Sequence, residues 1–209
     1  MKLQRLYLLS AAALMVLAIS APETVLAATE RIVYQPSTDS CTRSGTDPLK
    51  ECYTTIGSAI EAAVVADGDY ITIKPGTYTT EPLTLSKNVS ITGAETARTI
   101  ISGGGSGPII TVSGASGISI RKLTFISATM GINVTSSSSV DITNNVFWLG
   151  TSGTAVSVES SSLADIINDT FYQNGTGVLT AVNITIKNNI FSNNTHHVIA
   201  SGGLVLSGS

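Results

Sequence analysis

A repeat in the second half of the chain constrains its fold more than any other feature. Four hexads begin with Ile and end with Phe, at residues 120–125, 142–147, 166–171 and 186–191. Their first residues are separated by 22, 24 and 20 positions. A fixed order of residue types at a nearly constant period is typical of a solenoid, in which each repeat stacks on the one before.

A second set of apolar residues repeats with almost the same period. Its members are Ile110, Ile132, Val156, Val178 and Val198. Apolar and polar residues alternate within each short run, which is the pattern of a strand with one buried face. Short strands between turns rich in Gly, Ser and Asn predict an all-β, parallel β-helix, a single stack of about six coils about 4.8 Å apart.

Two side-chain columns follow from this register. Phe125, Phe147, Phe171 and Phe191 are predicted to form an internal aromatic stack. The third residue of the last three hexads is Asn144, Asn168 and Asn188. Asn tolerates the left-handed backbone of a tight corner, so we predict a ladder of Asn turns that can hydrogen-bond to neighbouring coils.

The start of the stack is predicted to carry a cap. Residues 53–65 place Ile56, Ala59, Ile60 and Ala63 on one helical face, and a turn at 67–69 ends this helix. Such a helix would cover the apolar end of the first coil, which would otherwise be exposed to water. The first coils are expected to begin with strands at 70–73, 75–78, 83–85 and 89–91.

The first 27 residues have the pattern of a secretory signal. Lys2 and Arg5 precede an apolar run at 6–19, and small residues lead to a cleavage site after Ala27. The alternative is an uncleaved anchor, but the apolar run is shorter than the roughly 20 residues that span a bilayer. We therefore expect an exported protein, secreted or at the cell surface, with no stable membrane insertion after cleavage.

The mature chain is acidic. Removal of residues 1–27 takes away two of 11 basic and one of 14 acidic residues, which leaves 9 and 13 and a formal charge of −4. A nucleic-acid partner is excluded, because no clustered basic face is present to neutralise phosphates. The segment 28–52 holds Cys41 and ends at Cys52, and in an exported chain this pair predicts a disulfide rather than two free thiols.

The mature chain resembles the pectin-lyase-like superfamily. The resemblance rests on residues 53–63, 67–69, 71–78 and 89–93, followed by the Asn-Asn-x-Phe coils. It implies a right-handed parallel β-helix over 53–209 and a group rich in polysaccharide-active enzymes. The chain lacks a Gly-His-Gly like that of polygalacturonases and a Gly-x-x-Asp-Phe-Ile-Phe-Gly like that of pectin methylesterases. Whether it is an enzyme therefore stays open, because one fold hosts many reactions.

A candidate Ca²⁺ site lies on the outward side of the Ile column. The register stacks Asp141 on Asp165, and two carboxylates about 5 Å apart suit a cation between them. Arg121 and Lys187 lie on the same face and are weak candidates for a catalytic base or charge clamp. The alternative is a hydrated surface without a ligand, because Ca²⁺ prefers 6–8 oxygen ligands. No cofactor is otherwise required.

A candidate glycan-binding surface follows the Phe column. Trp148 and Tyr172 are each the next residue after a core Phe, so they should point outward in one column with Ile126 and Ser192. Aromatic faces stack on the apolar faces of sugar rings. The alternative is that the loop after Leu149 folds over Trp148 and buries it. The adjacent His196 and His197 should face opposite ways and cannot serve one site.

Three functions are compatible with these observations. The leading interpretation is an exported β-helix module that contacts polysaccharide or a cell-surface glycan without robust catalysis. The second is a Ca²⁺-dependent polysaccharide lyase or related enzyme, either whole or cut short at residue 209. The third is an adhesin passenger or stalk, since 171–174 and 191–194 resemble the Phe-x-x-Asn repeat of chlamydial-type polymorphic outer-membrane proteins. The strand-like C-terminal segment, uncapped at 209, suggests self-association as one alternative.

Overall fold

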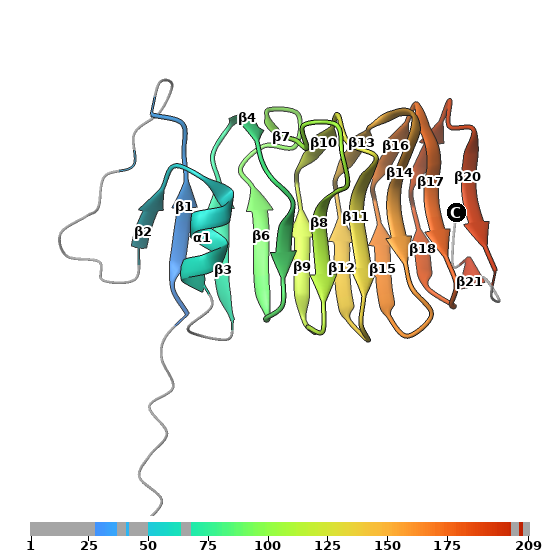
Figure 1. The fold of residues 1–209 in the computed structure, drawn as a ribbon, viewed down its shortest axis with the longest axis horizontal. Coiled ribbons are helices and arrows are strands. Elements are labelled where there is room, and N and C mark those ends of the chain that lie inside the picture. Colours follow the sequence, from blue (N-terminus) through green and yellow to red (C-terminus); the bar gives the residue numbers. More distant parts are fainter. Residues whose placement is uncertain (1–27, 37–40, 42–49, 64–67, 202–204, 207–209) are drawn as a thin grey trace, which may run out of the picture.

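Figure 1 shows the computed structural model, which describes residues 28–36, 41, 50–63, 68–201 and 205–206. The predicted signal segment 1–27 lies outside the described residues, as do positions 64–65 of the predicted cap and 207–209 of the predicted C-terminal strand. Within the described part, the strands run side by side from the N-terminal end to the C-terminal end of one elongated stack (Figure 1).

The described strands form three parallel sheets. Sheet A has nine strands in the order β2 (Lys50–Tyr53), β1 (Glu30–Val33), β3 (Asp69–Ile73), β6 (Val89–Gly93), β9 (Ile118–Arg121), β12 (Ser139–Thr143), β15 (Leu163–Ile167), β18 (Thr185–Lys187) and β21 (Val205–Leu206). Sheet B has six strands in the order β4 (Gly76–Thr79), β7 (Thr99–Ser102), β10 (Thr124–Ile126), β13 (Val146–Trp148), β16 (Thr170–Tyr172) and β19 (Ile190–Ser192). Sheet C has six strands in the order β5 (Leu83–Leu85), β8 (Pro108–Ser113), β11 (Met130–Thr135), β14 (Gly150–Val158), β17 (Asn174–Thr180) and β20 (His196–Ala200).

The predicted fold class is confirmed. Each coil takes one strand from each sheet in chain order, so β3 to β20 make six complete coils of a right-handed parallel β-helix. β21 begins a further coil, and β1 and β2 extend sheet A beyond the first one. The backbone hydrogen bonds of each coil are therefore satisfied by the coils on either side.

The repeated apolar residues form the core, as the period predicts. Ile120 pairs with Ile142, which pairs with Ile166, and the column continues to Ile186. The second column pairs in register in the same way and is buried from Ile110 to Val178. The four Phe rings stack with centroids 4.9, 5.1 and 4.7 Å apart and planes within 8° of parallel. Truncation of such a buried ring to Ala costs about 3–5 kcal/mol.

The predicted Asn corners are left-handed, but their hydrogen-bonded ladder lies one residue further along. Asn144, Asn168 and Asn188 have φ of 58°, 60° and 55°. The side chains that bond neighbouring coils belong to the next residue in each turn, because in the sharp turn between sheets A and B this residue points inward. The backbone N–H of Leu123 donates to Asn145 Oδ1 (3.1 Å), and Asn145 Nδ2 donates to the Ile120 carbonyl (3.0 Å).

The inner ladder is the row of inward side chains Asn145, Asp169 and Asn189 on successive coils. Asp169 differs from the two Asn residues because it has no amide N–H to donate. Its Oδ1 accepts from the backbone N–H and from Nδ2 of Asn145, at 2.6 and 3.0 Å. Its Oδ2 is buried and has no hydrogen-bond partner. Burial raises the pKa of the carboxyl from its ordinary 3.8 to about 8, although hydrogen bonds from Asn145 and the Ile167 backbone oppose the rise. The acid is therefore largely protonated at neutral pH.

A second ladder explains the Phe-x-x-Asn repeats. Asn174 is fully buried at the turn between sheets B and C, where its Oδ1 accepts from the Leu149 N–H (2.9 Å) and its Nδ2 donates to the Phe147 carbonyl (3.0 Å). Asn194 repeats these contacts one coil later, with its Nδ2 donating to the Phe171 carbonyl (2.8 Å). The motif is thus accounted for by the folding of the turn.

The N-terminal end is closed by a short helix, α1 (Ile56–Ala62), which packs against β1, β2 and β3. The helix begins later than the predicted residue 53, because Tyr53 ends β2 and Thr55 caps the helix by accepting from the Ser58 N–H. The predicted apolar face is buried at Ile56, Ala59, Ile60 and Ala63. Beside it, Arg31 forms a 2.5 Å ion pair with Asp69, a fully buried carboxylate, and donates to the carbonyl of Ala62 (3.0 Å).

The predicted Cys41–Cys52 disulfide is present and holds residue 41 next to β2. Since Cys52 pairs with Ile32 of β1, the disulfide attaches residue 41 to the N-terminal end of sheet A.

Candidate functional site

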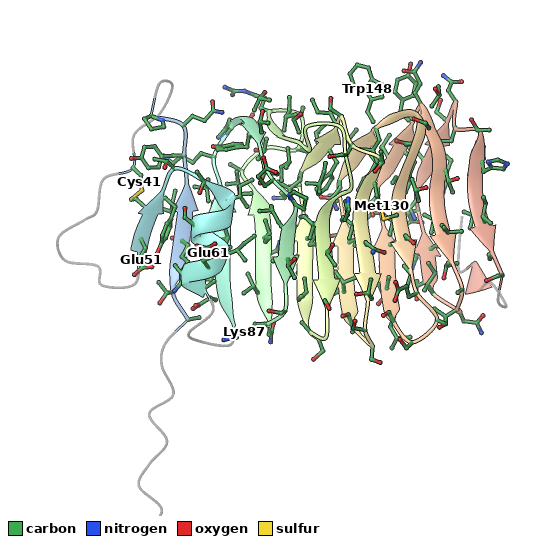
Figure 2. All side chains as sticks on the ribbon, in the orientation of Figure 1. Cys41, Glu51, Glu61, Lys87, Met130 and Trp148 are labelled. Atoms are coloured by element: carbon green, nitrogen blue, oxygen red, sulfur yellow. A yellow bond between two sulfur atoms is a disulfide. The ribbon has the colours of Figure 1, made fainter. Side chains whose placement is uncertain are left out.

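The outer face of sheet B carries an exposed aromatic pair. Trp148 and Tyr172 end β13 and β16, and the residue before each is a fully buried Phe, so strand alternation turns both rings outward. Trp148 is 53% exposed and Tyr172 is 37% exposed. Their ring centroids lie 6.4 Å apart, with planes at 52°. Figure 2 shows Trp148 projecting from the ribbon. The alternative in which the following loop buries Trp148 is wrong.

Neighbouring groups fix the orientation of the indole and leave a shallow groove beside it. Trp148 Nε1 donates to Gln173 Oε1 (3.1 Å), and this hydrogen bond joins side chains of adjacent coils. The groove has a volume of about 300 Å³ and is lined by Ile126, Ser127, Trp148, Leu149 and Gly150. A rigid aromatic platform next to a groove can hold the apolar face of a sugar ring while hydroxyl and amide groups at its rim hydrogen-bond to the sugar.

The predicted aspartate pair lies on sheet A. Asp141 on β12 is directly opposite Asp165 on β15, and both are exposed. They line a groove of about 340 Å³ with Ser139, Leu163, Ala164, Asn183, Ile184, Thr185 and Val140. Within the described residues, no group of three or more His, Cys, Asp or Glu side chains is arranged to hold a metal ion.

The two basic candidates do not join the aspartates in one centre. Arg121 pairs with Thr143, Thr143 with Ile167, and Ile167 with Lys187. Arg121 and Lys187 are therefore three coils apart, about 14 Å at the usual strand spacing. Arg121 Nε donates to Thr92 Oγ1 (2.9 Å) on the preceding coil, which lies on the side away from the aspartates.

The two grooves are separate sites. One is built from strands of sheet A and the other from sheet B and the turn that follows it, and they share no residue. Along one coil, Asp141 is followed by the Asn144–Asn145 corner before the chain enters β13, so the aspartates and the aromatic pair face different directions. A single ligand bound at the aromatic pair therefore does not depend on the aspartates.

The adjacent histidines face opposite ways, as strand alternation predicts. The His197 ring lies 5.7 Å from the Phe191 ring at the end of the core, centroid to centroid. His196 continues the outward column of Met130, Thr154 and Thr176, which places it three coils from Met130. The pair cannot act on one ligand.

Sequence reasoning missed two kinds of residue in this region. Gln173 was overlooked as the partner of Trp148, because its role arises only from the left-handed turn (φ 53°) that it occupies after β16. The groove residues Ser127 and Gly150 were likewise missed. Their positions in successive turns after sheet B were the available signal, since turns of neighbouring coils stack.

The fold defines a pectin-lyase-like, right-handed parallel β-helix protein. The profile of the family described as "Periplasmic copper-binding protein (NosD)" matches residues 84–207, which is more than half of the chain, and the protein belongs to this family. The description of the family as periplasmic agrees with the expected export. In the described part of the chain, no helix has the length and apolar character needed to cross a membrane. A comparison with curated proteins found no match.

Solved structures share the fold at low sequence identity. A pectin methylesterase variant in complex with a hexasaccharide is 16% identical, with a TM-score of 0.50 over 78% of this chain and 56% of that one. The pectin methylesterase of Erwinia chrysanthemi is 15% identical, with a TM-score of 0.46 over 78% of this chain and 66% of that one. The chain thus spans little more than half the length of the first of these esterases.

Proposed function

We propose that this protein is an exported β-helix module that binds polysaccharide on the outer face of sheet B without robust catalysis. The observation that carries the proposal is the exposed pair of Trp148 and Tyr172 in ring contact beside a groove. Large aromatic rings are normally buried, so two in contact on a flat sheet face indicate a contact surface. The hexasaccharide bound to an esterase of the same fold supports a sugar as the ligand.

The spacing of the strands favours a chain-like ligand. Trp148 and Tyr172 lie on successive coils about 4.8 Å apart, and a sugar ring in a polysaccharide repeats at about this distance. Consecutive sugars can therefore contact consecutive coils. The lyase interpretation finds less support, because Arg121 and Lys187 lie three coils apart and Arg121 Nε donates to Thr92 on the side away from the aspartates.

The family's description names copper binding, for which a protein must supply suitable donor groups. Copper is held in proteins by imidazole, thiolate and thioether groups. Among the described residues, His196 and His197 face opposite ways, Met130 is three coils from His196, and both Cys41 and Cys52 are in a disulfide. These donors do not fit a copper site, so no step of the proposed function involves copper.

The test is binding of the exported protein to a panel of insoluble and soluble polysaccharides, measured by pull-down and affinity electrophoresis. Trp148→Ala and Tyr172→Ala should each weaken the binding that the wild type shows by about 3–10-fold, the loss of one aromatic contact worth about 0.5–1.5 kcal/mol. Tyr70→Ala is the matched control, because Tyr70 is 41% exposed but lies on sheet A.

Two outcomes would contradict the proposal. One is that the wild type binds no polysaccharide of the panel. The other is that Trp148→Ala and Tyr172→Ala retain full binding while their circular dichroism matches the wild type. Product formation from a polysaccharide, followed in the ultraviolet with Ca²⁺ present, would instead favour the lyase interpretation.

A further inference from the structure

The outer face of sheet B carries no charged side chain at any described strand position. Buried residues such as Tyr78, Ile101 and Phe125 alternate with outward ones, which the register places in two rows. The first row is Thr77, Ile100, Thr124, Val146, Thr170 and Ile190. The second row is Thr79, Ser102, Ile126, Trp148, Tyr172 and Ser192. Hydroxyl, aliphatic and aromatic groups make up the whole face.

The described turns that border the aromatic pair also carry no exposed charged side chain. Asp169 lies in the turn that leads into β16, but its side chain is buried. The turns leading into sheet B carry Lys74, Arg98 and Lys122 in the first three coils. In the coils of Trp148 and Tyr172 the corresponding turns carry Asn144 and Asn168 instead. At the other edge, the turns after the two aromatic residues hold Leu149, Gly150 and Gln173.

From this distribution we infer that the ligand of the aromatic pair is an uncharged glycan, an inference that rests on the proposed function and narrows its ligand class. A uronate bound here would partly lose the water around its carboxylate. It would regain no Arg, Lys or helix N-terminus in exchange, and an unpaired charge is costly to desolvate. A neutral sugar loses no such hydration. Its ring stacks on Trp148, and its hydroxyls can exchange hydrogen bonds with water for bonds to Ser127 and Gln173.

Sheet A shows that the composition of sheet B is not a general property of the surface. Its outer face carries Arg121, Asp141, Asp165 and Lys187 in described strands. Exposed charge is thus present on the adjacent sheet of the same coils, but among the described residues it is absent around Trp148. The chemistry around the aromatic pair therefore selects against polyuronates such as unesterified pectin.

The experiment compares two hexasaccharides with the same sugar backbone, hexagalacturonate, in which each carboxyl is ionised, and its fully methyl-esterified form, in which each carboxyl is a neutral ester. Trp148 is the sole tryptophan of the 209 residues, so its fluorescence reports on the site directly. The full exported protein is titrated with each probe at about 0.15 M salt, where long-range repulsion from the acidic protein is largely screened. The neutral panel of the previous experiment is titrated in parallel. The neutral ester should bind at least about tenfold more tightly than the acid.

A gain-of-binding variant separates local chemistry from net charge. Ser192→Lys places one cation beside Tyr172 and should raise affinity for the acid several-fold while affinity for the ester stays unchanged. Ser119→Lys adds the same charge on sheet A and should change the affinity for neither hexasaccharide. Equal or tighter binding of the acid by the wild type would overturn the inference and leave the proposed function standing. Absence of any response to the ester and to every neutral polysaccharide would refute the proposed function itself.

Discussion

Replacement of Asp169 by Asn should stabilise the protein at neutral pH and remove a pH dependence of its stability. At the equivalent rungs, Asn145 Nδ2 donates to the Ile120 carbonyl and Asn189 Nδ2 donates to the Ile166 carbonyl. The corresponding carbonyl for Asp169 is that of Ile142, and Asp169 Oδ2 forms no hydrogen bond. Asp169→Asn supplies the missing amide, so it completes the ladder without a change of shape.

The magnitude follows from the raised pKa of Asp169, about 8 against 3.8. The folded state holds this proton more tightly than the unfolded state does. The free energy of unfolding is therefore highest below pH 3.8, falls as pH rises toward 8, and is constant above that. At 1.36 kcal/mol per pH unit, ionisation of this carboxyl in the unfolded state lowers the free energy of unfolding by at most about 4 kcal/mol at pH 7. Asp169→Asn should recover a large part of this cost.

The assay is urea unfolding of the oxidised protein at pH 5, 6, 7 and 8.5, followed by circular dichroism. The advantage of Asp169→Asn over the wild type should grow by up to about 1.4 kcal/mol per pH unit between pH 5 and 8. Asp165→Asn is the matched control, because Asp165 lies four residues earlier and is exposed. It should change stability by less than about 0.5 kcal/mol at every pH. An advantage of Asp169→Asn that does not grow with pH would refute the reasoning.

Two further predictions concern stability. Asn174→Ala leaves the Leu149 N–H and the Phe147 carbonyl buried without partners and should cost about 2–4 kcal/mol in urea unfolding, whereas Asn183→Ala, at an exposed position, should cost less than about 0.5 kcal/mol. A small loss for Asn174→Ala would show that the second ladder, formed by Asn174 and Asn194, is dispensable. Asp69→Ala leaves Arg31 buried without its closest carboxylate and should lower the free energy of unfolding by about 3–5 kcal/mol. Glu95→Ala, which removes the exposed Arg98–Glu95 ion pair, should lower the free energy of unfolding by at most about 1 kcal/mol. Equal losses for the buried and the exposed pair would contradict the reasoning that burial makes the Arg31–Asp69 pair costly to break.

The architecture could be predicted from the sequence because equivalent residues recur at a nearly constant spacing along the chain. A residue such as Ile142 has Ile partners 22 positions before it and 24 after it, and parallel stacking converts this sequence spacing directly into contact. The same rule placed Asp141 opposite Asp165 and aligned the Phe rings. The cap helix was also predictable, because amphipathic spacing at Ile56, Ala59 and Ile60 depends only on local geometry.

Properties that depend on several coils at once required the tertiary structure. The sequence could not say whether Trp148 is covered, because its exposure depends on the path of the loop after Leu149. It assigned the hydrogen-bonding ladder to Asn144 and not to Asn145, because the left-handed corner decides which of two adjacent side chains turns inward. Likewise, the buried and protonated state of Asp169 arises from surrounding turns. Periodicity specifies which residues are neighbours, whereas burial and charge state depend on everything that surrounds them.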